Sequence, residues 1–176
     1  MPEAELPVRA IVSAVADAAD HGLTLWANGE TRVRQWEKVP GHPVCEADLA
    51  LDAMLRESLT AIDPTAGWLS EETADTVHRL GLSRVWVVDP IDGTRDYLRG
   101  RRGWAVSVAL VEDGAVRIGI LAAPARNELW VAQAGQGATR NGKALQAGSR
   151  TQLPGARVPA DQLPRTDRDL VAVEKP

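Results

Sequence analysis

The sequence is poor in several residue types, and each scarcity excludes a class of protein. Cys45 is the single cysteine among 176 residues, so no disulfide can form within the chain and a cytosolic location is expected. No apolar run approaches the roughly 20 residues of a membrane-spanning helix. Phenylalanine is absent whereas tryptophan occurs six times, which we interpret as a feature of core composition with no bearing on function.

The chain also lacks an excess of positive charge. Lys and Arg total 20 against 24 Asp and Glu, which gives a formal net charge of −4. A mildly acidic chain is not typical of a protein that binds a nucleic acid polymer or a membrane surface. The acidic N-terminal residues Met1–Glu5 are the reverse of a signal peptide's basic start. We therefore expect a cytoplasmic protein with neither kind of partner.

The remaining composition, 44% hydrophobic and 25% charged, is that of an ordinary globular protein. Apolar residues recur at helical spacing from Val8 to Ala19, which predicts an amphipathic helix ending near Gly22 or a little later. A second helix is predicted over residues 46–62. The polar segment 27–43 is expected to be irregular.

Beyond Gly67 the pattern changes to short strands. They are predicted over residues 67–70, 85–88, 104–111, 116–122 and 128–132. The apolar run 85–88 is typical of a strand covered on both faces, and Asp113-Gly114 predicts a hairpin turn. These elements predict an α/β (α+β) fold with layered helices and a largely antiparallel sheet.

Residues 1–147 are predicted to form one domain. The stretch 148–169 is rich in Pro, Gly and charge and is predicted to be a connection, with a further strand beginning at 170–173. A strand with nothing after it to pair with it or cover it is unfavourable. We therefore expect residues 148–176 to be a connection and the truncated start of a second, C-terminal domain that is missing.

Two carboxylates follow the apolar run in the segment from Val85 to Thr94. The strand is predicted to end at Asp89, and Pro90 forces a turn because it has no N–H group. Asp92 then returns toward the same point. The alternative is that an aspartate simply caps the start of a helix. A cap does not need two acids together with Pro, Gly and Thr in this order.

The next residues suit a phosphate group. Gly93 allows a close backbone approach, and Thr94 adds a hydroxyl. If the chain is helical from Arg95 onward, N–H groups near Gly93 and Thr94 lie at a helix start, where anions bind. Two carboxylates beside a phosphate site need a counter-charge, and Mg²⁺ is the usual one.

A second acidic element is Ser70-Glu71-Glu72-Thr73. It follows a short predicted strand, so one glutamate can point into a site and the other away. A glutamate pair alone is typical of a solvated helix start, and its weight here comes from Asp89 and Asp92. Three convergent carboxylates form an oxygen site for more than one Mg²⁺.

Together these motifs resemble the inositol monophosphatase family, which also contains 3′(2′),5′-bisphosphate nucleotidases and fructose-1,6-bisphosphatases. The resemblance rests on Asp-Pro-Ile-Asp-Gly-Thr at 89–94, Leu-Ser-Glu-Glu at 69–72 and Pro-Val-Cys-Glu-Ala-Asp at 43–48. It runs from about residue 8 to residue 145.

The resemblance implies a role for each matching residue. The metal ligands would be Glu71, Asp89, Asp92 and the backbone carbonyl of Ile91. The phosphate-binding residues would be Asp92, Gly93 and Thr94. The catalytic residues would be Glu71, Asp89 and Thr94, with Thr94 and Glu71 orienting the attacking water. Asp48 would hold metal-bound waters from an outer shell.

The reaction implied by the resemblance is Mg²⁺-dependent hydrolysis of a phosphate monoester. The substrate would be a small phosphorylated molecule of the inositol monophosphate or 3′-phosphoadenosine 5′-phosphate type, and Arg95 favours the second. A homodimer is also consistent with the family. The alternative function is that of a catalytically inactive remnant that binds metal or phosphate.

Two departures from the family pattern bear on activity. Cys45 replaces a threonine, which removes a hydroxyl helix cap and costs about 1 kcal/mol. We expect Cys45 to be a small buried side chain and not a nucleophile. The family's later Trp-Asp motif, which supplies a further metal-ligating Asp, does not occur in the 176 residues. We therefore expect impaired activity.

Other motifs in the chain fit different chemistries less well. Haloacid-dehalogenase-type phosphatases place their two acids two residues apart, whereas Asp89 and Asp92 are three apart. The segment 135–140 starts like a dinucleotide-binding loop but has Arg140 where glycine is required, so a turn is expected. The arginines of 99–102 are either a solvated loop or a patch that steers an anionic substrate.

Overall fold

A computed structural model describes residues 6–26, 33–149, 151 and 152. The chain divides into two units, residues 1–146 and residues 147–176. Every described helix and strand belongs to the first unit. Within the second, no helix or strand occurs among the described residues 147–149, 151 and 152. The strand predicted at 170–173 lies outside the described residues, and the domain assignments 1–147 and 148–176 stay predictions.

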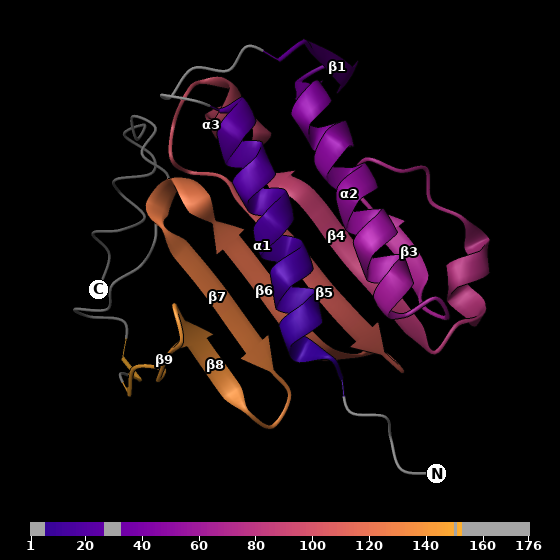
Figure 1. Ribbon diagram of the computed structural model, residues 1–176, viewed down its shortest axis with the longest axis vertical. Helices are drawn as coiled ribbons and strands as arrows, with labels where there is room; N and C mark the ends of the chain where they lie inside the picture. Colours follow the sequence, from indigo (N-terminus) through magenta and orange to yellow (C-terminus); the bar gives the residue numbers. More distant parts are fainter. Residues whose placement is uncertain (1–5, 27–32, 150, 153–176) are drawn as a thin grey trace. The chain divides into compact units, whose positions relative to one another are not determined.

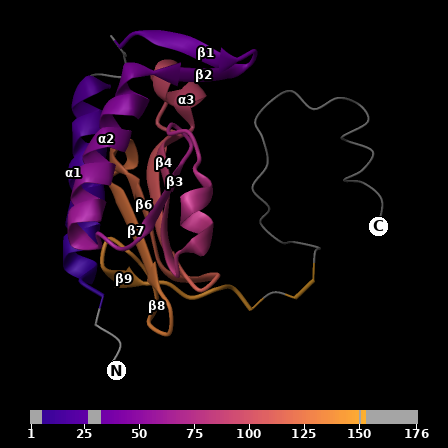
Figure 2. The same ribbon diagram turned by 90° about the vertical axis from the view of Figure 1, so that its right-hand side faces the viewer.

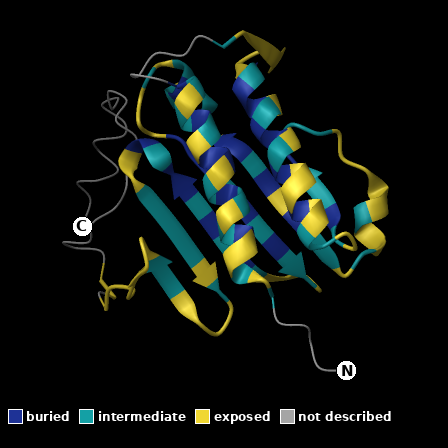
Figure 3. Cartoon of the chain, in the orientation of Figure 1, coloured by how far each residue is buried: buried dark blue, intermediate teal, exposed yellow. Residues whose placement is uncertain are grey.

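Two long amphipathic helices form one layer of the fold. They are α1 (Val8–Leu25) and α2 (Glu46–Ile62), and the range predicted for the second helix is confirmed. Their inward residues are buried and their outward residues exposed (Figure 3). Within the described part of the chain, no helix is long and apolar enough to cross a membrane.

A seven-stranded sheet forms the second layer (Figure 1). In spatial order its strands are β3 (Gly67–Ser70), β4 (Arg84–Asp92), β5 (Ala105–Glu112), β6 (Ala115–Ala123), β7 (Glu128–Gln133), β8 (Gly137–Arg140) and β9 (Lys143–Ala144). β3 and β4 are parallel and all other neighbours are antiparallel. Both helices cover the same face of the sheet (Figure 2). The expected α/β fold with a largely antiparallel sheet is confirmed.

Burial alternates along β4, which corrects one expectation. Trp86 and Val88 face the helices and are buried, whereas Val87 between them is 36% exposed. Residues 85–88 are therefore covered on one face and not on both. The continuous apolar sequence does not show which face is covered, because successive side chains of a strand point to opposite faces whatever their polarity.

Residues 27–43 were expected to be irregular, and this was wrong for the described part from Gln35. Here β1 (Gln35–Val39) and β2 (His42–Cys45) form an antiparallel hairpin. Gly41 at its turn has a φ of +83°, a conformation that glycine adopts without strain. The hairpin leads directly into α2.

A short helix, α3 (Thr94–Leu98), follows β4 and is anchored in the core by Tyr97. The Tyr97 hydroxyl donates to the Gly22 carbonyl of α1 at 2.9 Å. Its ring packs edge-on against Trp104, with centroids 4.9 Å apart. The turn before α3 is thus held by the hydrophobic core.

Candidate active site

The parallel pairing of β3 and β4 brings two predicted site residues together. Ser70 is in register with Val88, so Glu71 and Asp89 leave the same edge of the sheet. The Glu71 N–H donates to the Val88 carbonyl at 3.2 Å, and the Glu71 carboxyl group lies close enough to Asp89 to raise the pKa of Asp89. Three acids were predicted to converge. Glu71 and Asp89 lie together, but among the described residues no three acidic side chains are grouped closely enough to hold a metal ion.

β4 does not end at Asp89 as expected but continues to Asp92 with an irregular register between the two. Pro90 lacks an N–H group, which interrupts the hydrogen-bonding ladder. Pairing with β5 resumes at Asp92 and Ala105. The interruption carries both aspartates to the same pocket.

Burial and negative neighbours raise the pKa of Asp89 to about 7 from its ordinary value of 3.8. Desolvation is the largest cause, followed by the charges of Glu71 and Asp92. The three carboxylates therefore concentrate negative charge that a cation would stabilise.

These residues line a pocket of about 570 Å³. The sequence-predicted residues in its wall are Glu71, Asp89, Ile91, Asp92, Gly93 and Thr94. The hairpin and α3 supply the others, namely Lys38, Val39, Gly41, His42, Pro43 and Arg95. The arginines of 99–102 are not in its wall. Arg101 lies 3.6 Å from Asp96, and Arg102 donates to the Ala125 carbonyl.

The Gly93 turn requires glycine. Its φ is +91°, and a Cβ atom there would lie 2.7 Å from the Gly103 carbonyl oxygen. The Gly93 carbonyl accepts from the N–H groups of Asp96 and Tyr97. α3 has only five residues, so its dipole is small and any phosphate contact at Gly93 and Thr94 depends on individual N–H groups.

Asp48, on the first turn of α2, connects that helix to the phosphate turn. It is 1% exposed, and burial raises its pKa. Its Oδ1 lies 3.2 Å from the Thr94 hydroxyl, which is also 3.0 Å from the Ile91 carbonyl. Its Oδ2 accepts from the Cys45 N–H at 2.8 Å and from the Cys45 thiol at 2.9 Å. Cys45 is buried, as expected.

Sequence reasoning missed two residues near the pocket, Lys38 and Asp52, and it did not predict the contact that Arg95 makes. The Lys38 ammonium donates to the Glu71 carbonyl at 3.0 Å and pairs with the Glu72 carboxylate at 2.6 Å. Arg95 donates to the Gly41 carbonyl and ties α3 to the hairpin. Asp52 accepts hydrogen bonds from Ser70 and Thr73. The sequence did give one indication that Asp52 is buried: it lies four residues after Asp48, on the apolar side of the predicted helix.

Comparison with known proteins gives the family. The model of the inositol monophosphatase family matches residues 7–174, which extends the similarity beyond residue 145. The chain belongs to the inositol monophosphatase family.

Two curated members of this family are similar over most of the chain. A histidinol-phosphatase of Mycobacterium tuberculosis is 40% identical over 125 residues, which cover 71% of this chain and 47% of the relative. An inositol-1-monophosphatase of Rhizobium meliloti is 38% identical over 119 residues, which cover 68% and 44%. The chain spans about half the length of the curated relatives it matches.

Solved structures of the inositol monophosphatase family share the fold. Thermotoga maritima IMPase superposes with a TM-score of 0.71 at 28% identity, over 81% of this chain and 54% of that one. The extragenic suppressor protein SuhB of Bartonella henselae gives 0.75 at 26% identity, over 81% and 55%.

The carboxylate and carbonyl groups in the wall of the pocket are of the chemical type that binds a hard divalent cation. Carboxylate and carbonyl oxygens are the ligands that Mg²⁺ prefers. Glu72, whose Oε2 atom is buried with no hydrogen-bond partner among the described residues, is paired with Lys38 through Oε1 and does not line the pocket. Among the described residues, no three His, Cys, Asp or Glu side chains are grouped closely enough to form a metal cluster. Repulsion between the carboxylates opposes such a grouping.

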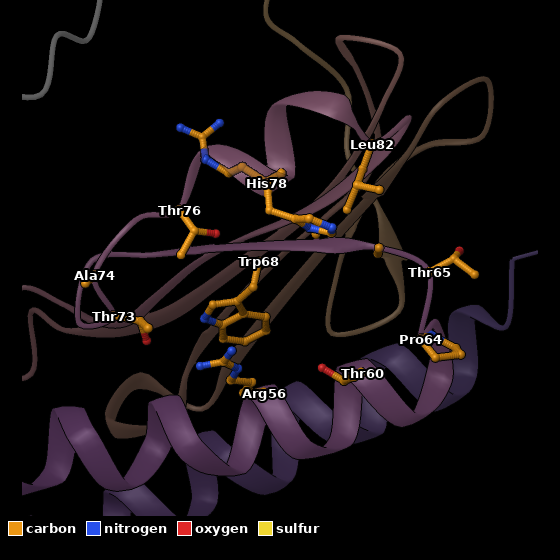
Figure 4. Close-up of a pocket in the computed structure, with 13 residues that line it drawn as sticks. Arg56, Thr60, Pro64, Thr65, Trp68, Thr73, Ala74, Thr76, His78 and Leu82 are labelled. Carbon is orange, nitrogen blue, oxygen red and sulfur yellow. The ribbon is translucent and has the colours of Figure 1, made fainter.

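A second pocket, of about 520 Å³, lies between α2, β3 and the 3₁₀ helix η2 (Val77–Gly81) (Figure 4). Its polar groups are largely engaged with other residues. Arg79 is paired with Asp75 at 2.7 Å, Arg56 lies 6.0 Å from the centroid of the Trp68 ring, and Thr73 is bonded to Asp52. No carboxylate of the described residues lines this pocket, so the pocket at Asp89 is the candidate active site.

Proposed function

We propose that this chain binds Mg²⁺ and the phosphate group of a small phosphate monoester in the pocket at Asp89, and that hydrolysis of the monoester is the function of the site. The observation that carries the proposal is the meeting of Glu71 and Asp89 beside the Gly93–Thr94 turn. Membership of the inositol monophosphatase family supports a phosphatase.

Glu71, Asp89, Asp92 and the Ile91 carbonyl would hold the metal. When bound, Mg²⁺ offsets the negative charge of the phosphoryl oxygens and increases the acidity of the attacking water. The N–H groups of Gly93 and Thr94 would bind the phosphate.

The Thr94 hydroxyl can donate its proton to Asp48 at 3.2 Å. The hydroxyl oxygen of Thr94, which lines the pocket, could then accept a hydrogen bond from a water there. Glu71, which lines the same pocket, would take a proton from that water. Thr94 and Glu71 would thus orient the water for attack on phosphorus, with loss of the alcohol and no covalent enzyme intermediate.

The names of the relatives suggest the first substrates to test. They are a histidinol-phosphatase and an inositol-1-monophosphatase, so histidinol phosphate and inositol 1-phosphate are the primary candidates. 3′-Phosphoadenosine 5′-phosphate is the third. In the sequence, Arg95 favoured 3′-phosphoadenosine 5′-phosphate. In the structure, its side chain donates a hydrogen bond to the hairpin backbone, so it gives this substrate no added support.

The experiment is release of inorganic phosphate from these three compounds by the purified chain, with Mg²⁺ or with EDTA. We expect release that requires Mg²⁺ and falls about a hundredfold or more in Asp89→Asn. Asp75→Asn is the matched control, because Asp75 is paired with Arg79 outside the pocket. Release that persists in EDTA and in Asp89→Asn would contradict the proposal.

A second candidate is binding of metal and phosphate without turnover. It would use the same pocket wall, in which the acids Glu71, Asp89 and Asp92 lie beside the Gly93–Thr94 turn. Calorimetric binding of Mg²⁺ that Asp92→Asn weakens, together with no phosphate release from any of the three compounds, would select it over hydrolysis.

A further inference from the structure

Asp52 is a buried acid that does not line the candidate active site. It is 8% exposed and lies on α2 between the buried residues Leu51 and Leu55. Burying a carboxylate is unfavourable unless its oxygens receive hydrogen bonds. Both oxygens do: Oδ1 accepts from the Ser70 hydroxyl, and Oδ2 accepts from the Thr73 hydroxyl at 2.7 Å.

The two donors flank the glutamate pair. Ser70 is the last residue of β3, and Thr73 follows Glu72, so one carboxylate holds both ends of the turn 70–73. The Ser70 hydroxyl also accepts from the Glu72 N–H at 3.2 Å. Figure 4 shows Thr73 above α2 with its hydroxyl toward that helix.

The same turn is held from the hairpin side by Lys38. Its ammonium donates to the Glu71 carbonyl and pairs with the Glu72 carboxylate. The Glu71 N–H is bonded to Val88. The backbone of Glu71 is therefore fixed from three sides, which leaves its carboxyl group directed at Asp89.

We propose that Asp52 is a positioning residue which, through Ser70 and Thr73, fixes the turn 70–73 so that the Glu71 carboxylate is placed beside Asp89 for binding of a divalent cation. The inference rests on the proposed function of the site. Asp52 itself touches neither cation nor substrate, and its effect is transmitted by two hydroxyl groups.

The test uses Thr73→Val, which removes the hydroxyl at nearly constant volume, and Thr73→Ser, which restores it. Mg²⁺ affinity of the full chain is measured by calorimetry. Loss of a residue that orients a metal ligand typically weakens metal binding 10–100-fold, so we expect about tenfold weaker binding in Thr73→Val and wild-type binding in Thr73→Ser. Asp52→Asn should resemble Thr73→Val.

Asp63→Asn is the matched control. Asp63 lies just after the other end of α2 and also accepts from a threonine, Thr65, at 2.6 Å. Its loss should affect stability and leave Mg²⁺ affinity unchanged. A merely structural role of Asp52 would make Asp52→Asn and Asp63→Asn alike in Mg²⁺ affinity.

A second measurement separates this inference from the proposed function. Amide hydrogen exchange of Glu71 and Glu72 is followed in EDTA, where we expect about tenfold faster exchange in Thr73→Val than in Thr73→Ser. If the wild-type chain binds no Mg²⁺, the proposed function fails, and exchange alone decides whether Asp52 fixes the turn. Unchanged exchange overturns the inference, as does unchanged Mg²⁺ affinity in Thr73→Val.

Discussion

The N-terminal and C-terminal halves of α2 bury different side chains against the same sheet. The first half buries two acids, Asp48 and Asp52, beside the apolar Ala47 and Leu51, whereas the second half buries only the leucines Leu55 and Leu59. Each leucine gains about 1.5–3 kcal/mol from leaving water. Each acid loses free energy on burial unless hydrogen bonds replace its hydration.

The partners of the two halves explain this difference. Leu55 and Leu59 belong to the hydrophobic core. Asp48 contacts the phosphate turn through Thr94, and Asp52 contacts the Glu71 turn through Ser70 and Thr73. Both halves therefore pack into the hydrophobic core, and the first half also places two acids against two loops of the candidate active site.

The largest expected change in stability is at the apolar half. Leu55→Ala should lower the free energy of unfolding by about 2–5 kcal/mol, because it leaves a cavity in the core. Mg²⁺ affinity should be unchanged at temperatures where the variant is folded. Urea denaturation and calorimetry provide the two measurements. If Leu55→Ala weakened Mg²⁺ binding tenfold in the folded state, the division of α2 would be wrong.

The second prediction concerns the turn that Asp48 contacts. Gly93→Ala should lower stability by about 1–3 kcal/mol, because alanine at a φ of +91° is strained and its Cβ would press on the Gly103 carbonyl. Gly114→Ala is a control with positive φ and open space around it. Thermal unfolding of both variants should show the larger loss for Gly93→Ala, and equal losses would argue against the close contact.

The third prediction concerns pH in the metal-free chain. A raised pKa means that folded Asp89 keeps a proton that unfolded Asp89 has released between about pH 4 and 7. The free energy of unfolding should therefore fall as pH rises through this window. Because the carboxyl is partly solvent-exposed, we expect a fall of about 1 kcal/mol.

The measurement is the urea midpoint in EDTA at several pH values that span the window from about 4 to 7, with one point above it. Asp89→Asn should show a smaller decrease than the wild-type chain. Asp75→Asn should retain the full decrease, since Asp75 is an exposed acid paired with Arg79. Identical pH profiles for the wild-type chain and Asp89→Asn would contradict the cause given for the raised pKa.

The smallest effect is expected at Cys45, which precedes the acidic half of α2. Burial and the neighbouring Asp48 raise its pKa to about 12. Its thiol should resist iodoacetamide at pH 8 in the folded chain and react in urea. Mass spectrometry measures the modification, and rapid labelling of the folded chain would show that this end of α2 opens readily to solvent.

The sequence predicted those features whose signals are local. The bounds of α2 follow from its apolar spacing and from Asp63-Pro64 after it. The meeting of Glu71 and Asp89 follows from their places after two short apolar runs, residues 67–70 and 85–88. The β1 strand was missed because all five of its residues are exposed, so its sequence carries no burial pattern.

The contributions of Lys38 and Asp52 depend on partners distant in sequence. Lys38 contacts Glu71 across 33 positions, and Asp52 contacts Ser70 across 18. Nothing adjacent to either residue identifies those partners. Likewise, the strand pattern predicted only that one glutamate of the pair enters the site, and the family resemblance assigned that role to Glu71. In the structure Glu71 lines the pocket, and Glu72 is buried against Lys38.

The parallel pairing of β3 and β4 has a consequence for how the chain can change in length. Two neighbouring parallel strands need a connection that returns from the end of the first strand to the start of the second. Between β3 and β4 this connection is formed by residues 71–83. Its middle, η2, reaches the surface at Val77 and Leu80, which are 84% and 70% exposed. Extra residues there would lengthen the return path without altering the register that sets Glu71 beside Asp89. An inserted epitope or reporter peptide therefore has a permissive position in η2, and the β1–β2 hairpin, whose Lys38 contacts Glu71 directly, is not one.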